Sequence, residues 1–306
     1  MMIRFDNRVV IVTGAGVGLG RSHALGLAER GARVVVNDLG ASTDGQGVSS
    51  DAAISVVEEI KAIGGEAIAN GADVSNEEQV TDMVGETMKE WGRVDVLINN
   101  AGILRDKTLA KMTLDDFRKV VDVHLMGSAT CCHAVWPIMR EQSYGRIVLT
   151  ASASGLYGNF GQSNYGAAKA AMVGLMNVLH LEGRRDDIRV NTLAPTAATR
   201  MTESLMPDEA LALLKPETIT PGVLYLVSEN GPSRTILSAG AGTFAQTRIY
   251  ETQGHLIEGE ITPEAVADSW ADITEPTHQQ ELQDAFSQTR KYAVRAAQAK
   301  GLSLNW

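Results

Sequence analysis

A glycine-rich turn between a predicted strand and a predicted helix constrains the fold more than any other feature of this sequence. Residues 8–12 (RVVIV) have the pattern of a buried β-strand, and the next residues, TGAGVGLGRSHALGLAERG, open an amphipathic helix. Glycines let the backbone approach a pyrophosphate closely, and a helix amino terminus offers N–H groups and a positive dipole end. The spacing is G-x-x-x-G-x-G, not the dinucleotide fingerprint G-x-G-x-x-G. We nevertheless predict a dinucleotide contact at Gly14, Gly18, Leu19 and Gly20.

Strand and helix patterns alternate from this turn through residue 194. Such alternation predicts an α/β fold with a doubly wound parallel sheet, Rossmann-like, in a single domain with a C-terminal extension. We assign residues 1–240 to this NAD-binding catalytic domain, and we expect residues 241–306 to pack on the same domain or on a partner subunit. The later predicted strands are 32–37, 66–74, 94–102 and 146–150, and the later predicted helices are 49–65, 75–92, 116–139 and 166–182.

Asp38 follows the second predicted strand, 18 residues after Gly20, where dinucleotide-binding folds place an acidic residue on the adenosine ribose. A carboxylate there accepts hydrogen bonds from a 2′-hydroxyl and repels a 2′-phosphate. Leu39 and Gly40 supply no cation for such a phosphate. The cofactor predicted from these residues is therefore NAD and not NADP. The alternative is that Asp38 is only a turn residue after a strand.

Other candidate cofactor contacts follow the later strands. Asn100, Ala101 and Gly102 are small or polar enough to lie beneath an adenosine at the carboxyl end of a strand. The remaining predicted contacts are Asp73, Val74, Pro195, Thr196 and Thr199, together with the two helical residues described next.

Three side chains between residues 152 and 169 carry the predicted chemistry. Tyr165 and Lys169 have the i, i+4 spacing that puts both on one face of a helix, and Ser152 lies just beyond the strand-like RIVLT. A phenol exchanges protons poorly at neutral pH unless a nearby cation favours its phenolate, and Lys169 is such a cation. We predict that these three groups meet at one substrate oxygen, and that Tyr165 and Lys169 also contact the cofactor. A solvated amphipathic pair is the alternative for Tyr165 and Lys169.

The charge balance and the cysteines limit the classes of partner and compartment. Lys and Arg total 27 against 37 Asp and Glu, a net charge of −10, which argues against nucleic acid and anionic membranes as partners. The only cysteines, Cys131 and Cys132, are adjacent, which suits neither a disulfide framework nor a metal site. With no signal-peptide pattern and no peroxisomal address at the carboxyl terminus, we expect a cytoplasmic enzyme without a metal.

Two predicted helices, 116–139 and 166–182, carry apolar residues around most of their circumference. Such helices are buried on two sides. One side can face the sheet, and we expect the other to meet the same helices of a second copy in a homodimer or homotetramer, with Met172 and Met176 directed outward. The alternative is that the chain's own C-terminal extension covers them.

Taken in order, these motifs resemble the short-chain dehydrogenase/reductase family over roughly residues 5–240. The motifs are the glycine turn, Asp38, Asn-Asn-Ala-Gly at 99–102, Ser152, Tyr165-x-x-x-Lys169 and RVNTLAP at 189–195. Within the family the sequence is most similar to the (3R)-hydroxyacyl-CoA dehydrogenase units of peroxisomal β-oxidation enzymes, a group that also shows 17β-hydroxysteroid dehydrogenase activity. The segments that carry this closer similarity are VVVNDLG, NNAGILRDK, VDVHLMGS and SASGLYGNFGQSNYGAAK.

The sequence departs from the family pattern at two places. His124 stands where most members have an Asn that helps to hold a water near the lysine, so the resemblance implies either a relay through His124 or an ordinary helical histidine. Pro195-Thr196 replaces the usual Pro-Gly.

Four cations in the tail could bind CoA phosphates, or could form a solvated helix face: Arg290, Lys291, Arg295 and Lys300.

The resemblance implies an NAD-dependent oxidoreductase that oxidises a secondary alcohol, the (3R)-hydroxyl of a hydroxyacyl-CoA in fatty-acid or steroid side-chain degradation. In the same chemistry the alternatives are a steroid (17β-hydroxy) dehydrogenase and a 3-oxoacyl reductase, although Asp38 counts against a reductase that uses NADPH. An alternative of another class is a non-catalytic protein that senses NAD. Intact Ser152, Tyr165 and Lys169 argue against that role.

Overall fold

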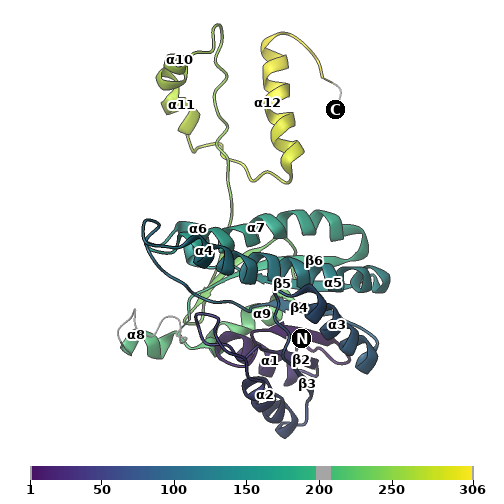
Figure 1. Ribbon diagram of the computed structural model, residues 1–306. Helices are drawn as coiled ribbons and strands as arrows, with labels where there is room; N and C mark the ends of the chain where they lie inside the picture. Colours follow the sequence, from purple (N-terminus) through teal and green to yellow (C-terminus); the bar gives the residue numbers. More distant parts are fainter. Residues whose placement is uncertain (1, 198–207, 305–306) are drawn as a thin grey trace. The chain divides into compact units, whose positions relative to one another are not determined.

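An eight-stranded sheet is the centre of the first of two units into which the chain divides (Figure 1). The computed structural model describes residues 2–197 and 208–304. The first unit is Met1–Gln246 and the second is Thr247–Trp306. The strands are β1 Val9–Thr13, β2 Arg33–Asn37, β3 Glu66–Asn70, β4 Val96–Asn99, β5 Gly145–Thr150, β6 Ile188–Pro195, β7 Ile236–Gly240 and β8 Thr243–Thr247.

The strand order confirms the predicted doubly wound α/β fold. The order is β3-β2-β1-β4-β5-β6-β7-β8, and every pairing from β3 to β7 is parallel. The chain winds outward from β1 in one direction and from β4 in the other. Ligands of such sheets bind at the carboxyl ends of the strands, where the winding reverses. The expected site therefore lies beyond the ends of β1 and β4.

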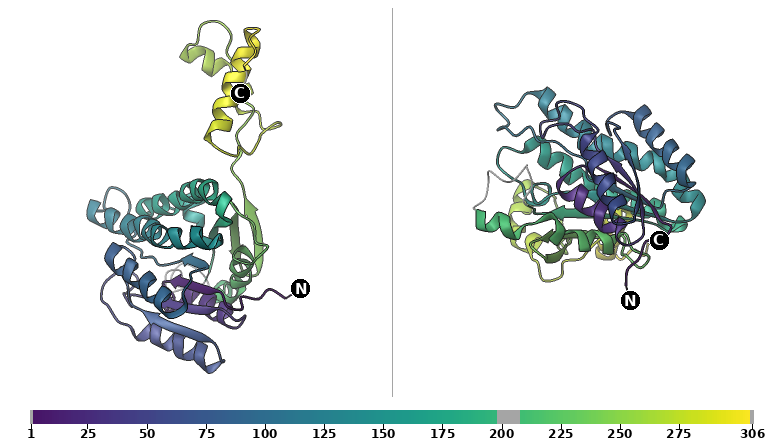
Figure 2. Two further views of the ribbon diagram at one scale, coloured as in Figure 1. Left: turned by 90° about the vertical axis from the view of Figure 1, so that its right-hand side faces the viewer. Right: turned by 90° about the horizontal axis from the view of Figure 1, so that it is seen from below.

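Helices cover both faces of the sheet (Figure 2). Successive strand residues point to opposite faces, so Ile11 packs in one buried cluster while Val10 and Val12 pack in the other. One cluster includes residues of α3, α5 and α7, and the other includes residues of α1, α2 and α9. The helices of this unit are α1 Gly18–Ala28, α2 Asp51–Ala62, α3 Glu77–Trp91, α4 Leu114–Val121, α5 Gly127–Gln142, α6 Ala153–Tyr157, α7 Ser163–Gly183, α8 Asp208–Leu213 and α9 Thr220–Leu226.

The predicted helix 116–139 is interrupted by a π-helical turn at Asp122–Met126, which joins α4 to α5. A π turn holds one residue more than an α turn and is often found at functional sites. It carries His124, which is buried. The 3.6-residue pattern alone cannot reveal such an insertion, because the apolar residues go round the helix on both sides of it.

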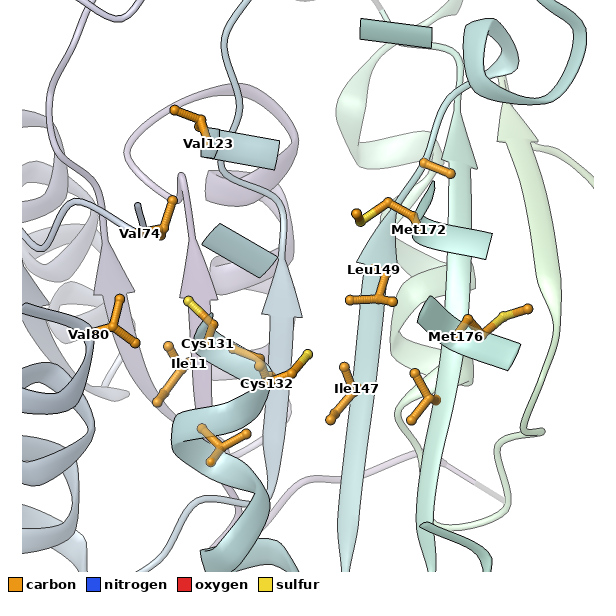
Figure 3. Packing of buried hydrophobic residues seen from close by; sticks show 14 of the residues in the cluster. Ile11, Val74, Val80, Val123, Cys131, Cys132, Ile147, Leu149, Met172 and Met176 are labelled. Carbon is orange, nitrogen blue, oxygen red and sulfur yellow. The ribbon is translucent and has the colours of Figure 1, made fainter. Parts of the chain in front are cut away.

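Met172 and Met176 of α7 point into the core and not outward as predicted (Figure 3). Both side chains are 1% exposed and pack in the cluster that contains Ile147 and Leu149 of β5. The prediction failed because α7 is apolar on nearly every side, so the sequence does not show which side faces the sheet. Apart from Glu182 near its end, the exposed residues of α7 form a stripe of small and apolar side chains at Ala167, Ala170, Gly174, Val178 and Leu181.

Between residues 247 and 304, the described part of the second unit, lie three helices, α10 Pro263–Asp268, α11 Trp270–Thr274 and α12 Ala285–Ala299. Lys291 of α12 forms an ion pair with Glu251 at 2.7 Å, and Arg295 donates to the carbonyl oxygens of Gln253 and Gly254 at 3.0 and 2.8 Å. Two of the four predicted phosphate partners are thus engaged within this unit. Their contacts attach α12 to the segment 251–254.

Candidate active site

Asn100 ties the ends of β1 and β4 together at the carboxyl edge of the sheet. Its side-chain amide donates to the carbonyl oxygens of Thr13 and Gly14 at 3.1 and 2.9 Å. In return the Thr13 hydroxyl accepts the backbone N–H groups of Asn100 and Ala101 at 3.0 and 3.1 Å. These four bonds hold the glycine turn against the segment that follows β4. Thr13 was not a predicted site residue.

The glycine turn leaves no room for a side chain at Gly14, Gly16 or Gly20. Gly14 and Gly18 have φ of +63° and +57°, in the left-handed region. A Cβ at Gly20 would lie 2.1 Å from the Gly14 carbonyl oxygen and 2.6 Å from the Asn100 amide nitrogen. Gly18, Leu19 and Gly20 form the first turn of α1, whose amino terminus has no side-chain cap. A bare backbone turn at an uncapped helix start fits a pyrophosphate.

Asp38 lies beside this turn with both carboxylate oxygens engaged by the backbone. One oxygen accepts the Gly16 N–H and the other accepts the Gly40 N–H, each at 2.7 Å. A Cβ at Gly16 would lie 2.8 Å from the Asp38 carboxylate. The carboxylate is therefore fixed next to the glycine turn, where a ribose attached to the pyrophosphate would lie.

The other predicted cofactor contacts follow the ends of β3 and β6. The Asp73 carboxylate accepts the N–H and hydroxyl of Ser75 at 2.9 and 2.6 Å, while Val74 is a buried core residue. Thr196 is exposed, and its N–H donates to the Ala239 carbonyl oxygen at 2.8 Å. Pro195, half-buried, ends β6. Thr199 lies outside the described residues.

Ser152, Tyr165 and Lys169, the three predicted catalytic residues, lie close together at the end of β5 and the start of α7. Ser152 caps α6 by accepting the Ser154 N–H at 3.1 Å, and its hydroxyl shares a hydrogen bond with the Tyr165 phenol. Lys169 lies one turn further along α7, with its amine 5.6 Å from the centre of the Tyr165 ring. That amine donates to the Thr150 carbonyl oxygen at 2.6 Å, which leaves two N–H groups.

Burial dominates the protonation of both groups on α7. Lys169 is 4% exposed, and burial lowers its pKa from 10.5 to about 7. Burial raises the pKa of Tyr165 above its ordinary value, the hydrogen bond from Ser152 opposes this, and the Asp106 carboxylate adds to it. We predicted a Tyr165 pKa lowered by Lys169. In the structure the pKa of Tyr165 shifts in the opposite direction, because removing a phenolate from water costs more free energy than the Ser152 hydrogen bond returns.

His124 lies against Tyr165. Its ring meets the Tyr165 ring edge-on, with centroids 5.2 Å apart, and its Nε2 is 2.8 Å from the oxygen and 3.1 Å from the nitrogen of the Ile103 backbone. Among the described residues its Nδ1 has no hydrogen-bond partner although it is buried. Burial, then the charge of Lys169, hold the pKa of His124 well below 6.5. The imidazole is therefore neutral, with one nitrogen available near the site.

Two polar residues that sequence reasoning missed fix the start of α7. Asn164 is fully buried, and its amide donates to the Arg105 carbonyl oxygen at 3.0 Å. Gln162 donates to the Asp106 carboxylate at 2.6 Å and accepts from the Ser154 hydroxyl at 2.7 Å. The available signal was the run of polar side chains in NFGQSNY immediately before the tyrosine, which is unusual for residues that enter a buried helix.

The chain is similar to one protein family and to known members of it. The family model for short chain dehydrogenases matches residues 8–210. A peroxisomal hydratase-dehydrogenase-epimerase of Saccharomyces cerevisiae is 50% identical over 277 residues, which is 89% of this chain and 31% of that protein. The chain thus spans about a third of the length of this relative.

Two solved structures share the fold. Full-length peroxisomal multifunctional enzyme type 2 from Drosophila melanogaster matches with a TM-score of 0.82 and 36% identity, covering 97% of this chain and 50% of that one. A 7α-hydroxysteroid dehydrogenase, solved with NADH and 7-oxo glycochenodeoxycholic acid, matches with a TM-score of 0.71 and 30% identity, covering 78% of this chain and 95% of the other.

These names overturn the predicted cytoplasmic location, because several of the most similar relatives are named as peroxisomal enzymes. The prediction used the cysteines and the absence of recognisable targeting patterns, and neither distinguishes the two compartments. None of the helices in the described ranges has the length and apolar character needed to cross a membrane.

Proposed function

Because the chain belongs to the short-chain dehydrogenase family and is an oxidoreductase acting on CH–OH groups, we propose that it uses NAD to oxidise the (3R)-hydroxyl of a hydroxyacyl-CoA from fatty-acid or steroid side-chain degradation. The observation that carries the proposal is the convergence of Ser152, Tyr165 and Lys169 at the carboxyl end of β5, which pairs with β4, the strand whose end Asn100 ties to the glycine turn. The yeast relative's name supports the substrate class, since a hydratase adds water to a double bond and so makes an alcohol for a dehydrogenase.

In this proposal the chain's own residues hold the reactants and move one proton. The glycine turn would hold the pyrophosphate of NAD, Asp38 the ribose, and Asn100 the segment beneath it; when bound, NAD supplies the nicotinamide that accepts a hydride. Ser152 hydrogen-bonds the substrate oxygen. The phenol oxygen of Tyr165 takes the hydroxyl proton, and the charged form of Lys169 stabilises the phenolate that this requires.

His124 has a proposed role in the same proton path. Its buried Nδ1 needs a hydrogen-bond partner, and a water there would connect the neutral imidazole with the amine of Lys169. The amine has two N–H groups beyond the one donated to Thr150, so it can bind such a water. The alternative is a structural histidine that only ties the π turn to Ile103.

The assembly of the enzyme is also a proposal. We expect a homodimer or homotetramer formed through α4, α5 and α7, because the outward stripe of α7 is small and apolar from Ala167 to Leu181. The extension that we placed at 241–306 would pack on the same catalytic domain or on a partner subunit.

Two other activities use the same site, and one class of function does not. A steroid (17β-hydroxy) dehydrogenase fits the same chemistry, and the solved hydroxysteroid dehydrogenase has a similar fold. A 3-oxoacyl reductase is disfavoured by Asp38, which repels the 2′-phosphate of NADPH. A protein that only senses NAD would not need Ser152, Tyr165 and Lys169 in contact.

The test is an activity screen with acyl-CoAs of graded length and with steroids, each with NAD and with NADP. We expect NADH production with (3R)-hydroxyacyl-CoAs. Tyr165→Phe should lower turnover by at least about 10²-fold, the low end of general acid–base contributions, while NAD affinity stays nearly unchanged. Turnover of Tyr165→Phe near that of wild type would remove the tyrosine from the mechanism, and NAD binding without any turnover would revive the sensor.

A further inference from the structure

Residues 103–107 (ILRDK) form a strap between the loop that follows Asp38 and the start of the catalytic helix. On the cofactor side, the Leu104 N–H donates to the Thr43 carbonyl oxygen at 2.8 Å. The Arg105 side chain donates through Nε to the Asp44 carbonyl oxygen at 3.0 Å. These two hydrogen bonds hold the loop that begins at Asp38, whose carboxylate is the predicted ribose ligand.

On the catalytic side, the same strap holds the first residues of α7. The Arg105 carbonyl oxygen accepts the buried amide of Asn164 at 3.0 Å, and the other end of that amide accepts the Tyr165 N–H at 2.8 Å. Next along the strap, the Asp106 carboxylate accepts the Gln162 amide at 2.6 Å. The position of Tyr165 is therefore set by polar contacts with the strap as well as by its own helix.

Arg105 is the residue that joins the two sides. Its Nη1 donates to the Asp116 carboxylate of α4 at 3.1 Å, while its Nε holds Asp44 and its backbone oxygen holds Asn164. The side chain is one quarter exposed, and Asp116 is less exposed still. The planar guanidinium can make both side-chain contacts at once in fixed geometry, which a lysine amine cannot.

We propose that Arg105 is a positioning residue that couples the ribose-binding loop to the catalytic tyrosine, so that a dinucleotide seated on Asp38 orders the start of α7. The proposal rests on the proposed use of NAD. Arg105 touches none of the predicted catalytic side chains, so its effect passes through Asp44 on one side and Asn164 on the other. When binding orders one of two linked segments, ordering the other segment costs less free energy.

Amide hydrogen exchange of the full chain, with NADH as the probe, tests the coupling. In wild type, NADH should slow exchange in peptides covering the glycine turn at 14–20 and the start of α7 at 163–169. In Arg105→Ala the protection at 14–20 should persist, while that at 163–169 falls by at least about threefold. The control is Arg118→Ala, which removes an exposed ion pair with Asp115 on α4 and should leave both protections unchanged.

The outcomes separate this proposal from the proposed function. Protection of 163–169 that survives in Arg105→Ala, or that is missing in wild type while 14–20 is protected, would overturn the coupling. Absence of NADH protection everywhere would refute the use of NAD, and the ligand-free proteins then decide. In those, Arg105→Ala should speed exchange at both 41–46 and 163–169, with β5 unchanged as a check of folding. Unchanged exchange at 163–169 would overturn the proposal.

Discussion

Replacing Lys169 with Met should make the protein more stable at neutral pH while removing its activity. The amine is buried and has a pKa of about 7 in the fold against 10.5 when exposed. That difference means that the fold gives up about 4 kcal/mol at pH 7 to keep this lysine inside. Met has similar length and no charge, but it leaves the Thr150 carbonyl oxygen without its donor, which costs about 1 to 3 kcal/mol. The net expectation is a gain of about 1 to 3 kcal/mol.

The size of this stabilisation depends on pH in a defined window. Between about pH 7 and 10.5 the unfolded chain binds a proton on Lys169 that the folded chain does not, so wild-type stability rises with pH there. The advantage of the Met variant is therefore largest at or below pH 7. It should shrink by about 3 kcal/mol by pH 10, where the unfolded lysine is also losing its proton.

Urea unfolding of both proteins at pH 7 and pH 10 measures this directly, and turnover should fall by at least about 10²-fold in the variant. Lys89→Met on α3 is the matched control, since that lysine is exposed and the substitution should leave stability nearly unchanged at both pH values. Equal destabilisation by Lys169→Met at pH 7 and pH 10 would show that the amine is charged and well solvated in the fold. The burial argument would then be refuted.

Three further substitutions test other parts of the site. Asp38→Ala combined with Leu39→Arg removes a repulsive carboxylate and adds a phosphate partner, so the ratio of kcat/KM for NADP over NAD should rise; an unmoved ratio would mean that the ribose binds elsewhere. His124→Asn should keep near-normal activity with a shifted pH profile if the residue serves a relay, whereas lower thermal stability with an unshifted profile would favour the structural role. Val178→Asp, on the outward stripe of α7, should dissociate the oligomer in light scattering; a wild type that already scatters as a 32.7 kDa species at micromolar concentration would contradict the interface.

The sheet and the placement of the glycine turn and Asp38 at its edge could be predicted because their signals are local. Buried parallel strands appear as short β-branched runs such as RVVIV, and glycines and Asp38 follow them at spacings that the βα unit imposes. Asn100 was placed correctly at a strand end. Its partner Thr13 was missed, because a hydroxyl in the last position of an apolar strand gives no sign of the two N–H groups that it will accept.

The predictions that failed depend on which side chains the tertiary structure buries. The outward face of α7 could not be chosen, because its apolar residues surround the helix and only the sheet decides that Met172 is inside. The predicted direction of the Tyr165 pKa shift was wrong for a related reason. The sequence supplies the charge of Lys169, but not the burial that raises the pKa of the phenol and lowers that of the amine itself.

The contact between Gly102 and His124 has a consequence for how this sequence can vary. A Cβ at position 102 would lie 2.2 Å from Cε1 of the imidazole, closer than any real contact, so even alanine would push the ring away from Tyr165. In a library of variants, substitutions of Gly102 should therefore have the same effect as substitutions that remove the imidazole of His124. A side chain at 102 becomes tolerable only together with a smaller residue at 124, so the two positions can change as a pair more readily than one at a time.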